Sequence, residues 1–115
     1  TLFEALQDDE TLGAETRSDA RFQFASLCFA GLGGPKDFAT AFPLLKLLKD
    51  DETLDAETRS DARFQFASLC YIGLEGQRDY ETARTLYELL KDDQNLPQDF
   101  REIAISNLEA LRSQE

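Results

Sequence analysis

The side chains with the greatest capacity for nucleophilic chemistry are two thiols, Cys28 and Cys70, and the sequence contains no histidine. Without histidine, catalytic triads that depend on an imidazole and most zinc sites are excluded. Neither thiol has a base beside it, and each falls on the apolar stripe of a predicted helix, where a thiol acts as a small hydrophobic group. The sequence therefore predicts that this protein is not an enzyme.

The two cysteines also occupy equivalent positions in a repeated stretch. Stacked helices lie ~8–10 Å apart between axes, whereas a disulfide needs Cα atoms within ~7 Å. Both cysteines are thus predicted to remain free thiols, which weakly favours a reducing compartment and leaves the localisation otherwise unknown.

Three acidic clusters are the next candidates for chemistry: residues 8–10, 50–52 and 92–93. Calcium loops of the EF-hand type place acids at alternate positions around a central glycine, whereas the acids here are contiguous. We interpret them as solvated acids at the joints between helices. The glycine-rich segment GLGGPKD (31–37) follows a predicted helix and lacks the Gly-Lys-Ser/Thr of a phosphate-binding loop. No metal and no cofactor are predicted.

The chain has 115 residues and a formal net charge of −11. This charge argues against nucleic acid or an anionic membrane as the partner, because both require faces rich in lysine and arginine. Two explanations stay open, a basic peptide or protein partner and simple solvation, and solvation is favoured. No apolar run approaches the ~20 residues needed to cross a bilayer. Because Thr1 has no preceding methionine, we expect the chain to be a piece of a longer protein.

A long internal repeat dominates the sequence. The stretch 50–70, DDETLDAETRSDARFQFASLC, also occurs at 8–28 with one difference, Gly13 in place of Asp55, at an offset of 42 residues. Self-similarity at a fixed period is typical of arrays in which each unit packs on its neighbour. The expected units are a partial second helix (1–9), repeat one (10–49), repeat two (50–91) and a C-terminal capping helix (92–115).

Apolar periodicity predicts that both repeats are helical hairpins. One 3.6-residue stripe in the first repeat consists of Ala20, Phe24, Leu27, Cys28 and Gly31. The expected fold class is all-α, an antiparallel helix-pair solenoid, with Pro43 kinking or shortening the second helix of repeat one. The predicted helices cover 14–30, 38–49, 80–91 and 97–112. The repeat implies one more, the first helix of repeat two, equivalent to 14–30.

The last predicted helix has one apolar and one polar face. Its apolar face carries Ala104, Leu108 and Leu111, as expected of a terminal cap. The opposite, wet face is predicted to carry Glu102, Asn107, Glu109 and Arg112.

The recurring residues of the two units form a pattern that resembles a known repeat family. The pattern reads Ala20, Phe22, Ala25, Gly31, Gly33, Asp37, Phe38, Ala41 in the first unit and Ala62, Phe64, Ala67, Gly73, Asp79, Tyr80, Ala83 in the second. It resembles the Sel1-like repeat, a relative of the tetratricopeptide repeat. HEAT repeats have a similar length of ~40–47 residues, but the glycine-rich loop followed by Asp-aromatic fits Sel1 better. Gly34, Gly76 and Glu75 depart from the family pattern.

This resemblance implies a right-handed superhelix whose first helices line a concave, partner-binding surface, and an adaptor or scaffold function. The partner-binding residues that it implies are Asp19, Phe22, Ser26, Phe29, Asp61, Phe64, Ser68, Tyr71, Ile103, Ser106 and Ala110. Alternating acidic and aromatic side chains favour a basic or amphipathic peptide or protein. For Phe22 and Phe64 a packing function is the stronger alternative, whereas Phe29 and Tyr71 are expected to be contact residues.

Two other interpretations remain open. The chain could be a structural module that self-associates end to end through its truncated N-terminal helix, where Leu2, Phe3 and Leu6 lack a partner helix. Alternatively, the near-identical repeats could have been engineered. The divergence after each cysteine, Phe29 against Tyr71 and Ala30 against Ile72, fits a natural duplication better.

Overall fold

The computed structural model describes residues 2–31, 37–73 and 78–113, and every regular element in these ranges is an α-helix. The prediction of an all-α protein is therefore confirmed. The predicted glycine-rich loops lie mostly outside the described residues, as do the side chains of Leu2 and Phe3. The helices are α1 (Leu2–Gln7), α2 (Ala14–Ala30), α3 (Phe38–Leu48), α4 (Ala56–Ile72), α5 (Tyr80–Leu90) and α6 (Gln98–Arg112).

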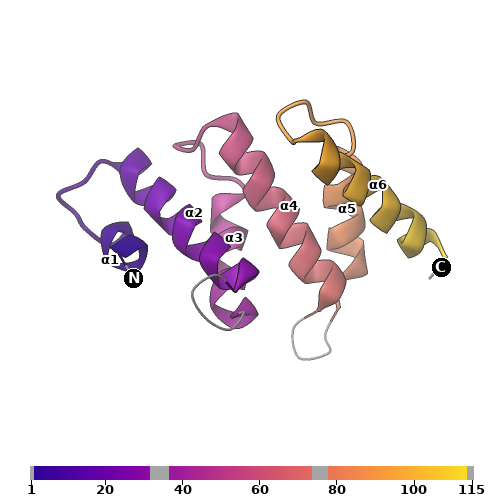
Figure 1. Cartoon of the computed structure of the whole chain (residues 1–115), viewed down its shortest axis with the longest axis horizontal. Coiled ribbons are helices and arrows are strands. Elements are labelled where there is room, and N and C mark those ends of the chain that lie inside the picture. The colour runs from indigo at the N-terminus through magenta and orange to yellow at the C-terminus, as the bar shows by residue number, and fades with distance from the viewer. Residues whose placement is uncertain (1, 32–36, 74–77, 114–115) are drawn as a thin grey trace.

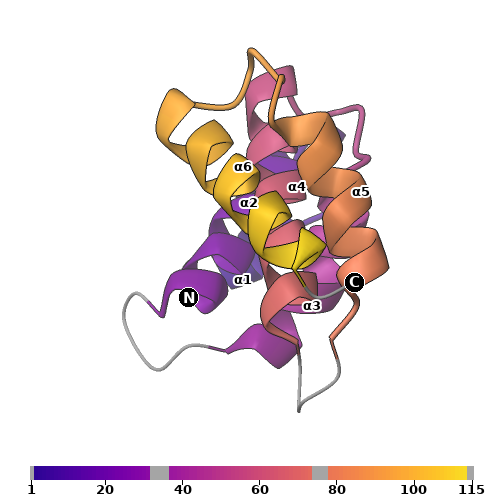
Figure 2. The same cartoon turned by 90° about the vertical axis from the view of Figure 1, so that its right-hand side faces the viewer.

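Each helix packs against the next one along the chain, and α2 also contacts α4. In Figure 1, α2, α4 and α6 lie side by side in a front layer, with α3 and α5 behind them. Figure 2 views the molecule from the α6 end and separates the two layers. The principal extents are 48 × 31 × 21 Å. None of the described helices is long and apolar enough to cross a membrane.

Local capping explains why α3, α4 and α5 begin where they do. Asp37 and Asp79 each accept a hydrogen bond from the backbone N–H three residues ahead, at 3.0 Å, as N-cap side chains do. Asp55 caps α4 in the same way through Thr58 N, at 2.8 Å. Its counterpart Gly13 has no side chain, so α2 begins without a side-chain cap.

Replacing Gly13 with aspartate is therefore expected to raise the free energy of unfolding by about 1 kcal/mol. The backbone at Gly13 is already extended (φ −66°, ψ 159°), and no other group lies within 4 Å of an added Cβ. Urea denaturation measures the change. Gly13→Ala stiffens the unfolded chain without supplying an acceptor, so equal gains from the two variants would show that the cap contributes nothing.

Pro43 lies inside α3 and is exposed, yet α3 has 11 residues, the same length as α5. Of the two predicted effects of this proline, kinking or shortening, shortening is therefore wrong. Thr85, at the equivalent place in α5, instead donates its hydroxyl to the carbonyl of Glu81 at 3.0 Å. Both side chains face solvent, so core packing fixes neither of them.

The hydrophobic core is densest around α4. Helices α3 and α5 pack against α4, α2 lies beside it, and Phe100 of α6 covers the ring of Phe64. Nearly the whole circumference of α4 is buried as a result, including Phe64, Phe66, Ala67, Leu69 and Cys70. In α2, by contrast, the equivalents of Phe66 and Cys70 are only half-buried.

Both cysteines are free thiols, half-buried at Cys28 and buried at Cys70. Burial raises the pKa of the Cys70 thiol to about 11. A thiol with such a pKa is protonated at neutral pH and is a poor nucleophile.

The acidic joints hold neighbouring units together. Asp51 accepts a hydrogen bond from the hydroxyl of Ser18 at 2.6 Å, and Asp93 accepts one from Ser60 at 2.5 Å, 42 residues further on. Partial burial acts to raise the pKa of Asp51, but hydrogen bonds from Ser18 and Thr53 outweigh it, so the pKa lies below its ordinary value. The prediction that the joint acids are merely solvated is therefore wrong for Asp51 and Asp93.

Candidate partner-binding surface

The residues predicted to bind a partner all lie in the layer formed by α2, α4 and α6, but they differ in exposure. Asp19, Ile103 and Ser106 are exposed, and Phe22 and Phe64 are buried. The half-buried members are Ser26, Phe29, Asp61, Ser68, Tyr71 and Ala110.

Burial favours the packing interpretation for the two central phenylalanines. Phe22 is 8% exposed and Phe64 7% exposed. The ring of Phe64 stacks on Phe100 of α6, with 4.9 Å between centroids, and meets the edge of Tyr87 of α5 at 6.3 Å. Phe64 therefore joins α4 to both of the helices that follow it.

Phe29 and Tyr71 are also drawn partly into packing. Phe29 lies 5.9 Å from Phe38 between ring centroids, and Tyr71 lies 6.1 Å from Tyr80. Both pairs connect the end of one helix with the start of the next. Only part of each ring is left to contact a partner.

Two of the predicted serines, Ser26 and Ser68, take part in polar contacts between helices. Gln65 of α4 donates from its side-chain amide to the Ser26 hydroxyl of α2, at 3.1 Å. Further along, the Tyr87 hydroxyl lies 3.2 Å from that of Ser68 and accepts a hydrogen bond from Asn107 of α6 at 3.1 Å. Asn107 was expected on the outer, wet face of the last helix, and that expectation is wrong. Its amide satisfies the hydroxyl of a fully buried tyrosine.

A cleft with a volume of about 490 Å³ opens on this layer. Its lining residues place it over the N-terminal half of α4, between α2 and the start of α6. Its walls are Phe22 from α2, Glu57, Thr58 and Asp61 from α4, and residues 94–98 with Arg101 from the α6 side. The cleft thus brings together two of the predicted site residues, Phe22 and Asp61.

The charges in the cleft are held apart. Asp61 is half-buried, and burial raises the pKa of its carboxyl group, although a hydrogen bond from Gln65 to Oδ1 at 3.2 Å acts in the opposite direction. On the other wall, the Nε atom of Arg101 is buried and has no hydrogen-bond acceptor among the described residues. The cleft therefore presents two carboxylates, those of Glu57 and Asp61, on the α4 wall and the guanidinium of Arg101 on the α6 wall.

Acidic groups also gather beside the cleft, at the exposed side of α2. Partial burial raises the pKa of Asp19, and the carboxylates of Glu15, Asp55 and Asp51 raise it further by repulsion. Mutual repulsion of this kind indicates a locally negative surface, which attracts positively charged ligands. No group of metal-ligating side chains that could hold an ion occurs among the residues described by the structure.

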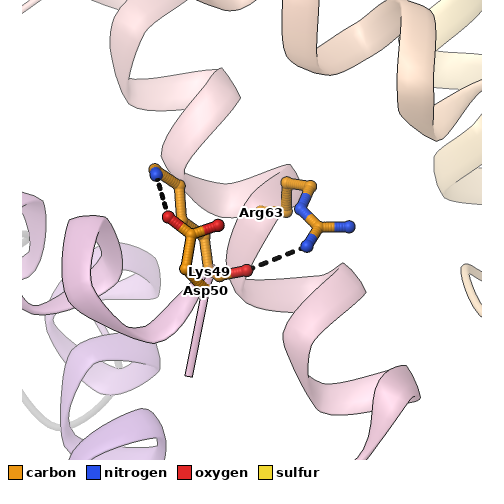
Figure 3. Close-up of polar contacts among 3 residues, drawn as sticks. All are labelled: Lys49, Asp50 and Arg63. Carbon is orange, nitrogen blue, oxygen red and sulfur yellow. Dashed lines mark hydrogen bonds and ion pairs between the residues drawn. The ribbon is translucent and has the colours of Figure 1, made fainter. Parts of the chain in front are cut away.

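Two of the nearby cations are already used inside the fold, as Figure 3 shows. Arg63 of α4 donates to the backbone carbonyl of Lys49 at 3.0 Å, where α3 ends. The Lys49 ammonium pairs with Asp50 at 2.6 Å and lies 5.6 Å from the centre of the Phe66 ring. These cations therefore anchor α3 to α4 and do not line the cleft.

Sequence reasoning missed Arg101 and the wall formed by residues 94–98. The available signal was the divergence of the repeat at this point, where QNLPQ replaces the ETLDA of residues 52–56. The substitution removes two acids from one wall of the cleft. The effect of this substitution depends on which residues face it across the cleft, and only the tertiary structure shows those residues.

No family model, no curated protein and no solved structure was found to match this chain. The likeness to Sel1-like repeats therefore rests on the residues of the sequence alone.

Proposed function

We propose that this chain is a Sel1-like, tetratricopeptide-like solenoid module, with a right-handed superhelical course, that binds a segment of a partner protein. In this proposal the layer of α2, α4 and α6 is the concave, partner-binding side. The recurrence of the Ser18–Asp51 contact as Ser60–Asp93, at the 42-residue period, supports a repeat architecture. Successive packing of each helix on the next supports it as well.

The cleft over α4 is the observation that carries the binding function. It lies on the layer where such repeats hold their partners, and its walls combine an aromatic edge with charged and amide groups. Interfaces commonly use such mixed surfaces, in which apolar contact supplies area and polar groups supply orientation. With a net charge of −11 and acids around Asp19, the favoured partner is a basic or amphipathic protein segment. The proposal assigns no catalytic residue and no cofactor.

End-to-end self-association ranks second. In α4, the side that carries Ser60, Phe64 and Ala67 packs towards α5 and α6. The same positions in α6 are Glu102, Ser106 and Glu109, all exposed. A face of this polarity provides little apolar area with which to hold another hairpin.

A pair of charge-matched variants tests the binding proposal. Asp19→Lys with Ile103→Lys alters exposed residues of the proposed face, whereas Glu81→Lys with Leu89→Lys makes the same changes in charge and similar changes in apolar area on α5. Immobilised wild-type and variant chains are incubated with lysate of the source cells, and retained proteins are quantified by mass spectrometry. Partners of the wild type are expected to be recovered roughly tenfold less on the α2/α6 variant.

The α5 variant is the control and should retain these partners. Recovery on the wild type should also fall as salt is raised, since exposed charges are screened. Equal losses from the two variants, or a loss confined to the α5 variant, would contradict the assignment of the binding face.

A further inference from the structure

We propose that the cleft over α4 is a subsite for a short extended peptide segment in which a basic and an acidic side chain flank a single residue. The basic side chain is assigned to Asp61 and the acidic one to Arg101. This inference rests on the proposed binding function and names the ligand chemistry of one place on the face.

The two charges of the cleft have not paired with one another. No hydrogen bond or ion pair joins Asp61 to Arg101 within the described residues, although both line the same cleft. Both residues are half-buried, and only the Nε of Arg101 is enclosed without an acceptor, as it also is at the equivalent Arg17 and Arg59. Two unpaired opposite charges in one cleft favour a ligand that carries both complementary charges over one that carries either alone.

The cleft has the size of a short peptide. A sphere of about 490 Å³ is roughly 10 Å across. Three residues of extended chain, at ~3.3–3.6 Å each, have a similar length. The volume of the cleft therefore suits a segment of about three residues.

The remaining lining offers both apolar and amide groups. The exposed Pro97 and the small exposed part of Phe22 give apolar contact for the methylene stem of a lysine or arginine. The side-chain amide of Asn95 makes no hydrogen bond within the part of the chain that the structure describes, and it is exposed at the wall. Such an amide can both donate to and accept from a peptide backbone.

The preceding unit carries acids where this wall carries none. The wall residues Gln94 and Pro97 replace Glu52 and Asp55 of the second repeat. Acids at these places would compete with an incoming carboxylate for Arg101. Their replacement leaves that wall neutral apart from the guanidinium, so the acidic half of the ligand meets an attractive charge.

The test is a titration of the ¹⁵N-labelled chain, followed by amide chemical shifts. The probes are three acetylated tripeptide amides: lysine-alanine-glutamate, and the two singly neutralised forms lysine-alanine-glutamine and glutamine-alanine-glutamate. We expect lysine-alanine-glutamate to shift amides at 57–61 and 94–101. We expect each neutralised peptide to bind roughly five- to tenfold more weakly, because one charge-assisted contact is lost.

Single-residue variants then separate the two halves. Asp61→Asn keeps an acceptor for Gln65 and should abolish discrimination between lysine-alanine-glutamate and glutamine-alanine-glutamate. Arg101→Gln should abolish discrimination against lysine-alanine-glutamine, whereas Arg101→Lys should retain it. Arg59→Gln, at the equivalent position of the preceding unit, and Glu81→Gln on α5 should leave all three affinities within about twofold. Amide spectra of each variant report whether it is folded.

Three results would overturn the inference: equal affinities for the three peptides, shifts centred away from this cleft, or no shifts at about 10 mM peptide. If cellular partners still depend on Asp19 and Ile103, the proposed function stands and only this subsite is rejected. If neither the peptides nor the partner assay gives a face-specific effect, both proposals fail.

Discussion

Replacing Phe66 with alanine is expected to lower the free energy of unfolding by about 3–5 kcal/mol. The side chain is 4% exposed, and its ring lies 5.0 Å from that of Phe42 between centroids. The Lys49 ammonium lies over the ring, 5.6 Å from its centroid. Truncation thus removes apolar contact between α3 and α4 and leaves a cavity that the surrounding helices fill only partly. Urea denaturation, with the slope held common among variants, measures the loss.

The control is Phe24→Ala, made in the same local sequence in the first repeat. Phe24 is only half-buried, so the expected loss is smaller, about 1–2 kcal/mol. The two substitutions change helix propensity equally, because they are made in the same local sequence. The difference between the two losses in the free energy of unfolding therefore measures how much more deeply Phe66 is buried than Phe24. Equal losses would mean that Phe66 is not a core residue of the kind described above.

Replacing Thr85 with proline is expected to destabilise the protein by about 3 kcal/mol or more. Thr85 lies in the middle of α5, where proline removes a backbone donor and its ring collides with the preceding turn. The hydroxyl contact of Thr85 with the Glu81 carbonyl is lost as well. Because the side chain is exposed, the loss reports the helix backbone and not the core. Thermal and urea denaturation both measure it.

The reciprocal change, Pro43→Thr, should raise the free energy of unfolding by about 1–2 kcal/mol. It restores a backbone donor in α3. The gain is smaller than the loss at Thr85 because α3 keeps its 11 residues around Pro43, so the ring clash that a new proline introduces is already relieved there. A loss of stability in Pro43→Thr would show that α3 has adapted its packing to the proline.

The acids of this protein divide into structural and surface groups, although they look alike in the sequence. Asp51 and Asp93 are acceptors for serines of the preceding helix, and Asp37, Asp55 and Asp79 cap helices. Asp19 and Asp61 have raised pKa values, in which burial is the main cause. A carboxyl group whose pKa is raised by folding binds its proton more tightly in the native state. Its contribution to stability is therefore fully present below the ordinary pKa and is lost as the pH rises through the folded pKa.

A partly buried carboxylate with a raised pKa lowers the stability of the folded protein at neutral pH. Such groups are found most often at functional sites, including ligand-binding surfaces. The position of Asp61 in the cleft fits this pattern. A basic group bound beside it would lower its pKa again, so peptide binding is expected to be coupled to proton release.

The sequence by itself determined the helices of this protein. The predicted boundaries at 30, 49, 91 and 97 lie within one residue of the observed ones at 30, 48, 90 and 98. Helix ends depend on local chemistry: Asp37 and Asp79 supply caps, and Gly31 and Gly73 adopt the positive φ that ends α2 and α4. Apolar periodicity, likewise local, predicted an all-α protein. The duplication predicted that contacts of one repeat recur in the next, as the Ser18–Asp51 contact does at Ser60–Asp93.

Only the tertiary structure decided which of two identical stretches is buried. Phe24 and Phe66 have the same neighbours in sequence, yet α4 is enclosed by α3, α5 and the adjoining helices of its layer, whereas α2 is less covered. The same holds for the cleft, because Asp61 and Arg101 are 40 residues apart and come together only when α6 packs beside α4. Burial and the pairing of charges depend on the residues that surround a side chain in space. Two identical stretches of sequence do not indicate which of them lies in the middle of the fold.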